Sequence, residues 1–250
     1  MIRRIDHPIA VVAAAAAAAV VVAAVAKRRK REEKPRKREA EPRAPMDRAQ
    51  LPSSPYTLLL EWMHEAEATE GIHARAMVLA TGSAAQGPTA RSVNMLRADA
   101  DSNEIIFGTN PSSLKGRQMA LDQRVEAVFR WGDRQVRVRG EAMFDGGREL
   151  TAAAYRDLPR GAQLSLRVAS QGKRVSDEEH ASAVEQVREL VAGQQTELEP
   201  PPSYAAARIK PTSIEFYQGA GVALGYINHD RFLYVHHAKE GQWATHRLQA

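Results

Sequence analysis

The chain has 250 residues, no cysteine, 35 Lys and Arg against 30 Asp and Glu, and a formal net charge of +5. The lack of cysteine excludes disulfides, cysteine-ligated zinc or iron–sulfur centres, and a thiol nucleophile. A hydrophobic content of 44% is that of a folded protein, and the length allows one large or two small domains.

The positive charge is confined to the start of the chain. Residues 1–44 hold twelve Lys and Arg and five Asp and Glu, a net of +7, so the remaining residues carry −2. Nine of these cations lie within residues 27–38, and no aromatic side chain is interleaved with them. Stacking aromatics accompany basic grooves that bind single-stranded nucleic acid. We therefore expect no nucleic-acid partner.

An apolar run precedes the basic one. Residues 9–26 are eighteen consecutive uncharged residues, eleven Ala, six Val and one Ile. As a helix this run spans ~27 Å, just short of the ~30 Å hydrocarbon core of a bilayer. We expect residues 1–26 to be a membrane anchor or targeting segment and residues 27–50 to be a basic disordered linker, with membrane contact through residues 9–38.

The basic flank predicts which side of the membrane the rest of the chain occupies. By the positive-inside rule, an anchor of this kind leaves the following domain on the cytoplasmic side. A cleaved signal peptide is the alternative, because Ala24-Val25-Ala26 has the small-x-small pattern before Lys27. An organelle transit peptide is a third possibility. These alternatives place the domain in the cytosol or in an organelle lumen.

Residues 51–250 are predicted to form one globular unit. A helix begins at Ser54-Pro55, a capping residue followed by proline in the first turn. Further helices are predicted over residues 112–121, 148–158 and 176–192, the last with Ser176 and Glu179 at capping-box spacing. Strands bounded by turn-forming residues are predicted over 76–81, 91–97, 104–109, 125–131, 135–144, 207–218 and 231–248.

This order of elements predicts the fold class. Short strands interrupted by helices favour a mainly β antiparallel barrel with peripheral α-helices over a parallel βαβ sheet. Neither GxGxxG nor GxxxxGK[ST] occurs, so a phosphorylated cofactor must be held by side chains. Histidine spacing such as HExxH is also absent, and we expect no metal site.

Several motifs, taken in order, resemble the pyridoxamine 5′-phosphate oxidase family. The resemblance covers roughly residues 50–250 and includes the family's C-terminal dimerisation region, about residues 200–250. The motifs that carry it are IIFGTNPSSLKGRQM (105–119), DRQVRVRGEA (133–142), PPPSYAAARIKPTSIEFYQG (200–219) and HDRFLY (229–234).

The resemblance implies an antiparallel FMN-binding split barrel that forms a homodimer, with FMN in clefts at the subunit interface. It implies an oxidase that converts the amine or alcohol of a phosphorylated B6 vitamer to the aldehyde, pyridoxal 5′-phosphate. Flavin accepts the hydride in that reaction and O₂ reoxidises it. The cofactor thus carries the redox chemistry while the protein supplies orientation and charge.

The resemblance also implies site residues. Those that match the family's catalytic positions are His229 and Arg231, and His229 with Arg97 would contact the substrate. Those that match its FMN-binding positions are Arg91, Thr109, Lys115, Gln135, Gln171, Tyr217 and Arg231. Cations suit a phosphate dianion, amides suit the edges of the flavin ring, and an aromatic side chain packs on it.

The departures from the family concentrate on the substrate. The family clamps the B6 phosphate with Tyr, Arg and Ser, and this chain has Ala154, Leu158 and Ala162 there. An arginine of the family becomes Ile227, and a lysine becomes Leu96, with Arg97 next to it as a possible replacement. Two alternatives therefore stay open: an FMN oxidoreductase of this fold acting on another substrate, and a flavin- or B6-vitamer-binding protein without turnover.

Overall fold

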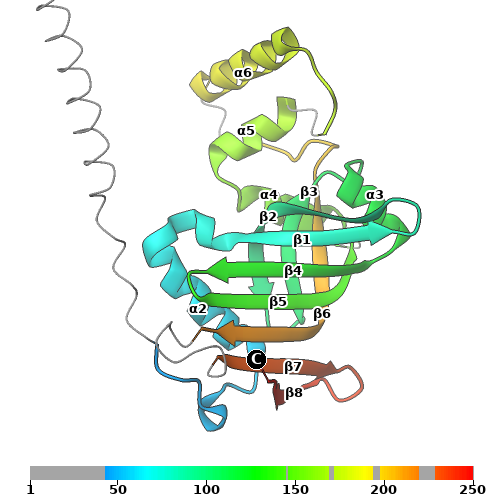
Figure 1. Cartoon of the computed structure of the whole chain (residues 1–250). Helices are drawn as coiled ribbons and strands as arrows, with labels where there is room; N and C mark the ends of the chain where they lie inside the picture. The colour runs from blue at the N-terminus through cyan, green and yellow to red at the C-terminus, as the bar shows by residue number, and fades with distance from the viewer. Residues whose placement is uncertain (1–42, 145, 169–171, 194–197, 220–228, 250) are drawn as a thin grey trace, which may run out of the picture. The chain divides into compact units, whose positions relative to one another are not determined.

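The computed structural model describes residues 43–144, 146–168, 172–193, 198–219 and 229–249 (Figure 1). The apolar run 9–26 and the basic run 27–38 lie outside these residues. No helix in the described part of the chain is long and apolar enough to cross a membrane.

The fold is one antiparallel sheet that closes on itself. The strands follow the order β3-β2-β1-β4-β5-β6-β7-β8, and a further pairing of β3 with β6 closes the first six into a barrel. The mainly β barrel predicted from the sequence is confirmed. The strands are β1 (Ala76–Ser83), β2 (Gly87–Asp99), β3 (Glu104–Thr109), β4 (Arg124–Trp131), β5 (Arg134–Met143), β6 (Ala205–Gln218), β7 (Asp230–His237) and β8 (Gln242–Arg247).

Helices flank the barrel, and most begin where the sequence predicts. Ser113 and Ser176 are N-caps, and Ser176 forms the predicted capping box with Glu179. The α-helices are α2 (Pro55–Glu70), α3 (Leu114–Leu121), α4 (Gly147–Arg156), α5 (Arg160–Val168) and α6 (Asp177–Ala192), and the 3-10 helices are η1 (Arg48–Gln50) and η2 (Gly71–Arg75).

Helix α5 has no counterpart in the sequence prediction. Pro159 and Gly161 at its start are typical of a loop. Tertiary contacts stabilise the helix instead, because the Tyr155 hydroxyl donates to the carbonyl of Gln163 at 2.6 Å. The Gln163 amide in turn donates to the carbonyl of Tyr155 at 2.9 Å.

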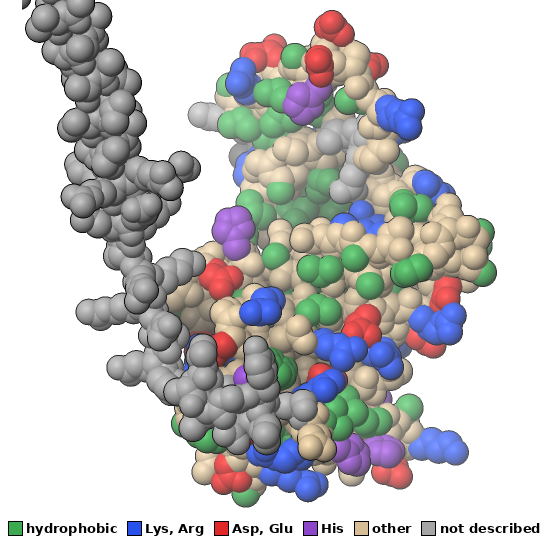
Figure 2. All heavy atoms as spheres, in the orientation of Figure 1, with side chains coloured by type: hydrophobic (Ala, Val, Ile, Leu, Met, Phe, Trp, Pro, Cys, Tyr) green, Lys and Arg blue, Asp and Glu red, His purple; other side chains and the backbone are tan. Residues whose placement is uncertain are grey.

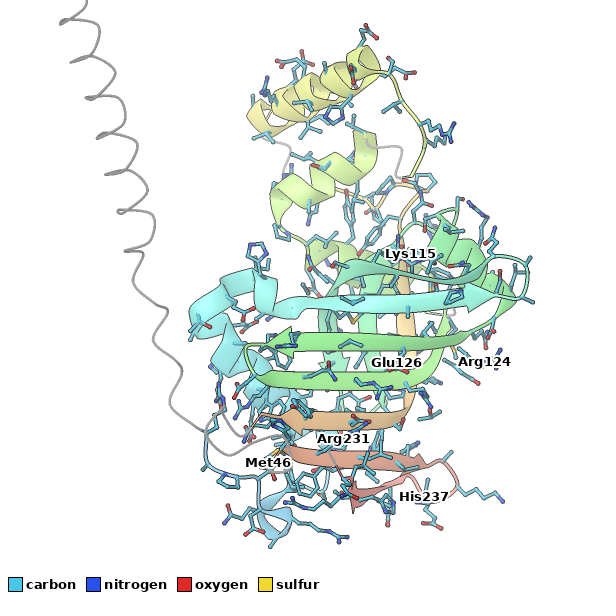
Figure 3. The ribbon with its side chains drawn as sticks, in the orientation of Figure 1. Met46, Lys115, Arg124, Glu126, Arg231 and His237 are labelled. Atoms are coloured by element: carbon cyan, nitrogen blue, oxygen red, sulfur yellow. The ribbon has the colours of Figure 1, made fainter. Side chains whose placement is uncertain are left out.

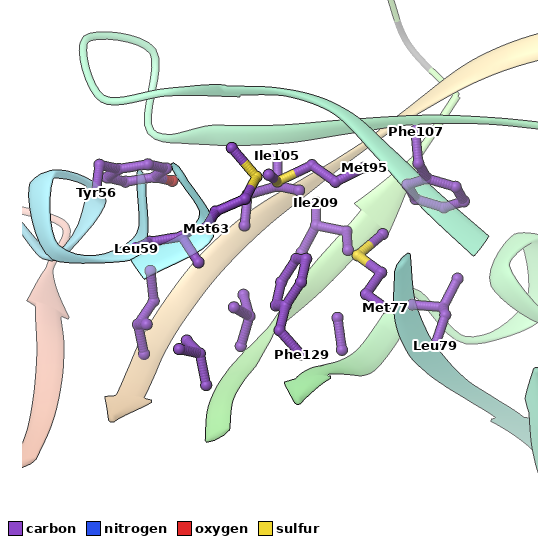
Figure 4. Packing of buried hydrophobic residues seen from close by; sticks show 14 of the residues in the cluster. Tyr56, Leu59, Met63, Met77, Leu79, Met95, Ile105, Phe107, Phe129 and Ile209 are labelled. Carbon is purple, nitrogen blue, oxygen red and sulfur yellow. The ribbon is translucent and has the colours of Figure 1, made fainter. Parts of the chain in front are cut away.

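Helix α2 packs against the barrel interior and completes the core (Figure 4). Leu59 and Trp62 on this helix are almost completely buried. The Trp62 ring meets the ring of Phe216 on β6 edge-on, with centroids 5.3 Å apart. Phe129 on β4 is fully buried in the same cluster.

Strand β6 joins the two parts of the sheet. Its first half pairs with β3, where Ala205 faces Thr109, and its second half pairs with β7, where Tyr217 faces Arg231. The register shifts opposite Gly140 on β5. A Cβ atom at Gly140 would lie 2.2 Å from the carbonyl oxygen of Lys210, so this close approach of two backbones requires glycine.

Residues 43–52 form a strap across β6, β7 and β8. The backbone N–H of Met46 donates to Asp230 at 2.6 Å, and the Gln218 side chain donates to the carbonyl of Ala44 at 2.9 Å. The Tyr234 hydroxyl donates to the carbonyl of Pro52 at 2.9 Å. The sequence assigned residues 43–50 to the linker, and these contacts attach them to the barrel.

Candidate functional site

Two cations without a carboxylate partner, the half-buried Arg91 and the buried Lys115, mark the first part of the site. Arg91 lies on β2 and Lys115 lies in the first turn of α3, where only 7% of Lys115 is exposed. Among the described residues, neither side chain has an acidic partner within 4.0 Å. Together with Thr109 at the end of β3, we call them the anion site.

The pKa values of Lys115 and Arg91 show that their charged forms are disfavoured in the absence of an anion. Burial lowers the pKa of Lys115, and the nearby charge of Arg91 lowers it further. Burial also lowers the pKa of Arg91. A bound anion would stabilise both charges, because an opposite charge favours the ionised form.

Arg91 is held in place by a polar network that the sequence did not predict. Its guanidinium donates to the carbonyl of Leu79 at 2.9 Å, to the Thr81 hydroxyl at 2.8 Å and to the Thr89 hydroxyl. Both threonines donate in turn to the fully buried Gln118 side chain, at 2.6 and 2.8 Å. The network fixes the guanidinium, since each threonine is held from two sides.

A short loop connects Thr109 at the end of β3 to Lys115 in the first turn of α3. The Thr109 hydroxyl is buried and has no hydrogen-bond partner among the described residues. Ser113 caps the helix by accepting from the N–H of Gly116 at 3.3 Å. A Cβ atom at Gly116 would lie 2.2 Å from the carbonyl oxygen of Pro111, so glycine lets the loop close tightly. A buried hydroxyl without a partner, together with two cations that lack an acidic partner, fits a bound anion.

The second part of the site lies on the outer face of β5, β6 and β7. Gln135, Tyr217 and Arg231 are register neighbours on these three strands. Their sequence neighbours Val136, Phe216 and Phe232 are fully buried, so strand alternation turns the three polar side chains outward. The ring of His229 lies 5.2 Å from that of Tyr217. We call Gln135, Tyr217, His229 and Arg231 the outer group.

Ion pairs order this outer face. The Arg231 guanidinium donates to Glu215 at 2.8 Å, and Glu215 also accepts from Arg137 at 3.3 Å. Arg137 forms a second ion pair with Glu126 at 2.6 Å. Figure 2 shows charged side chains of both signs interspersed with hydrophobic ones over this part of the barrel.

One copy of the chain does not bring the two parts together. Among the described residues, no hydrogen bond, ion pair or ring contact joins the anion site to the outer group. Thr109 pairs with Ala205 at the start of β6, whereas Tyr217 is twelve residues further along this strand. At ~3.3 Å per residue, about 40 Å of bent strand separates them. Figure 3 likewise shows Lys115 and Arg231 at different ends of the barrel.

The predicted substrate positions lie elsewhere on β2 and around α4. Arg97 forms an ion pair with Asp157 at 3.0 Å. Ala154 is buried in a small apolar cluster against which Leu96 packs. Leu158 is half-buried, as is Ala162. The predicted residues Gln171 and Ile227 lie outside the described residues.

Comparisons with known proteins agree with this architecture. Residues 64–218 match a family model described as pyridoxamine 5′-phosphate oxidase, and residues 204–250 match the pyridoxine 5′-phosphate oxidase C-terminal dimerisation region. A relative from Chromohalobacter salexigens, named pyridoxine/pyridoxamine 5′-phosphate oxidase, is 32% identical over 79% of this chain and 89% of its own length.

Two solved structures share the fold. PhzG from Burkholderia lata, in complex with tetrahydrophenazine-1-carboxylic acid, superposes with a TM-score of 0.68 at 23% identity, over 81% of this chain and 95% of that one. A pyridoxamine 5′-phosphate oxidase-related, FMN binding protein from Nostoc punctiforme gives 0.62 at 19% identity, over 78% and 96%.

Proposed function

This chain belongs to the pyridoxamine 5′-phosphate oxidase family, and from that premise we propose that it is an FMN-dependent oxidoreductase acting on CH–NH₂ or CH–OH groups. The observation that carries the proposal is the anion site. Arg91 is half-buried and Lys115 is buried, and both lack a carboxylate partner in the described structure. The buried hydroxyl of Thr109, at the end of the strand before α3, has no described partner either.

The residues present fit FMN. The phosphate of FMN is a dianion, and Arg91, Lys115 and Thr109 offer it two cations and one hydroxyl donor. Gln135 and Tyr217 of the outer group suit the amide edge and the face of a flavin ring. When bound, FMN supplies the two-electron chemistry that the protein side chains lack.

A homodimer would bring the anion site of one subunit next to the outer group of the other. The matched dimerisation region, residues 204–250, includes β6 and β7, which carry Tyr217 and Arg231. The outer face presents these side chains to a neighbour. In a two-fold dimer, if residue i of one subunit contacts residue j of the other, then j also contacts i. One subunit's outer group can therefore complete the other's anion site, and two equivalent sites result.

The outer group also supplies the residues placed to handle substrate. The Tyr217 ring packs against the His229 imidazole, and Glu215 holds the Arg231 guanidinium at 2.8 Å. In our proposal His229 and Arg231 orient the substrate's reacting carbon. The overall reaction would remove two electrons and one hydrogen from that carbon and a proton from its amine or hydroxyl group, and O₂ would take them up as hydrogen peroxide. For an amine, water then hydrolyses the imine to the aldehyde and ammonia.

Two substrate classes are supported by different observations. The name of the Chromohalobacter salexigens relative favours a phosphorylated B6 vitamer, oxidised to pyridoxal 5′-phosphate. The apolar cluster around Ala154 and Leu96 favours a substrate that is not clamped through a phosphate. Both keep the same cofactor and the same reaction.

The visible spectrum and turnover of the full-length protein test the proposal. We expect a yellow protein with a flavin spectrum that produces hydrogen peroxide and an aldehyde when a substrate is added in air. Pyridoxamine 5′-phosphate is the first substrate to try. A yellow protein without turnover on any amine or alcohol would indicate a flavin- or vitamer-binding protein. A colourless protein that cannot take up added FMN would refute the proposal.

We also propose, from the sequence alone, that residues 9–26 anchor the protein in a membrane with residues 27–38 on its cytoplasmic side. Its support is the uninterrupted Ala and Val run and the basic cluster after it. The full-length protein should then pellet with membranes and resist alkaline extraction. An Ala17→Arg variant should become extractable, because a charge at the centre of a span is costly.

A further inference from the structure

A cavity of about 520 Å³ opens along the second half of β2, after Arg91. Asn94, Leu96 and Arg97 of β2 form one wall, and Asp157 and Leu158 after α4 form another. Leu96 packs against Ile106 on β3, the strand that ends at Thr109. The cavity and the anion site therefore share strand β2, and β3 lies behind the cavity wall. We call this cavity, lined by residues of β2 and by Asp157 and Leu158, the Arg97 pocket.

The inner wall of the Arg97 pocket is apolar. Leu96 and Leu158 line it together with Met95. Behind Leu96 lies the buried cluster of Ile106, Ala154 and Ala206. None of these residues is a cation. An ionised group of a ligand that packed against them would lose its hydration without gaining an ion pair or a hydrogen bond.

The two arginines of the pocket are already neutralised. Arg97 pairs with Asp157 at 3.0 Å, and Arg75 pairs with Glu67 at 2.7 Å. Arg75 also donates to the carbonyl of Leu96 at 3.4 Å. Asp157 itself lines the pocket, so an entering anion would meet a carboxylate beside each arginine it approached.

The Arg97 pocket and the anion site differ in whether their cations have acidic partners. At the anion site, Arg91 and Lys115 have no acidic partner among the described residues. In the Arg97 pocket, each cation has one, within 3.0 Å. The anion site therefore carries an uncompensated positive charge that attracts a phosphate, whereas each arginine of the Arg97 pocket is paired with a carboxylate.

We propose that the Arg97 pocket binds the substrate as a flat ring compound that carries no phosphate or other anionic group. This inference rests on the proposed FMN-dependent activity and names its substrate class. A volume of about 520 Å³ is within the usual range for small-molecule pockets, ~300–1,000 Å³. The apolar wall packs against the ring, and the Asn94 amide can donate to or accept from a ring substituent.

Paired ligands that differ only in the phosphate test this inference on the full-length holoprotein. The pairs are pyridoxamine with pyridoxamine 5′-phosphate, and pyridoxine with pyridoxine 5′-phosphate. Binding is followed by the change in flavin absorbance and by calorimetry. We expect the phosphate-free member to bind as tightly as its partner or more tightly. Tighter binding of the phosphorylated member by tenfold or more, or no binding of either, would overturn the inference.

Two variants test the charge argument directly. Leu158→Arg adds an unpaired cation to the pocket and should strengthen binding of the phosphorylated member roughly ten- to hundredfold. Leu158→Met is its matched control and should not. Asp157→Asn removes the acidic partner of Arg97 and should increase the affinity for the phosphorylated member a few-fold. Asp101→Asn, in the exposed turn after β2, is its control and should leave that affinity unchanged. Equal responses of variants and controls would contradict the proposal.

These outcomes distinguish failure of the proposed FMN-dependent activity from failure of the proposed substrate class. Failure to bind FMN would refute the proposed function itself. A yellow protein that prefers the phosphorylated ligand would refute only the neutral pocket, and would leave the FMN-dependent activity in place.

Discussion

Replacing Lys115 by Met should move two properties in opposite directions. Lys115 is 7% exposed, and both burial and the charge of Arg91 lower its pKa. Without FMN the ammonium is therefore a cost to the fold, and Met keeps the length of the side chain while removing that cost. With FMN the same ammonium donates to the phosphate. We expect the apoprotein of Lys115→Met to be as stable as wild type or more stable, and its FMN affinity to fall.

The size of the loss follows from the contact removed. A hydrogen bond between charged groups contributes ~1.5–3 kcal/mol. At about 1.4 kcal/mol per tenfold change, the FMN dissociation constant should rise by roughly ten- to 150-fold. Quenching of flavin fluorescence on titration of the apoprotein measures this constant. The control is Arg117→Met, an exposed cation on the same helix, which should change the constant less than twofold.

The pH dependence of apoprotein stability gives an independent check on Lys115. Its folded pKa lies below the ordinary value of 10.5, so between the two values the unfolded chain binds more protons. The free energy of unfolding should therefore rise with pH across that window. Below the lowered pKa the cost is present in full. The Lys115→Met variant should lack this rise relative to wild type. An FMN affinity equal to that of wild type, together with an unchanged pH profile, would refute the assignment of Lys115.

Three further substitutions test the site and the fold. Thr109→Val should leave the apoprotein as stable as wild type, because its hydroxyl has no described partner, and should weaken FMN by roughly two- to tenfold in the same titration. Gly140→Ala should lower the free energy of unfolding in urea by at least ~1–3 kcal/mol, because the new methyl group meets the Lys210 carbonyl, whereas Gly161→Ala in helix α5 has free space and should stabilise by up to ~1 kcal/mol. Equal effects of the two would contradict the close backbone approach described for β5 and β6 at Gly140. Phe129→Ala should cost ~3–5 kcal/mol in the same experiment, and a loss below ~1 kcal/mol would show that this ring does not fill the core.

Local signals in the sequence were enough to predict most of the barrel. The strand over residues 104–109 has the predicted bounds, and the capping residues Ser113 and Ser176 begin helices as expected. Helix α5 and the strap of residues 43–52 were missed because both depend on contacts with distant residues. The Tyr155–Gln163 hydrogen bonds and the Met46–Asp230 contact have no local signature.

The site was predictable only in part. Family motifs led to Arg91 and Lys115, and the structure shows a half-buried and a buried cation without a described acidic partner. They did not lead to Gln118, which orders Arg91 through two threonines from another part of the chain. The neutral character of the Arg97 pocket was also hidden, because Asp157 is 60 residues away from Arg97 in sequence.

Subunit complementation tests most directly the claim that two copies build each FMN site. Lys115→Met disables the anion site and Arg231→Ala disables the outer group, so each homodimer should hold little flavin. Random mixing of the two variants, by refolding or co-expression, produces heterodimers with one intact site. The account predicts that about a quarter of the wild-type sites then bind FMN with wild-type affinity, since half the dimers are mixed and each has one of two sites intact. No recovery on mixing, with heterodimers shown to form, would contradict it.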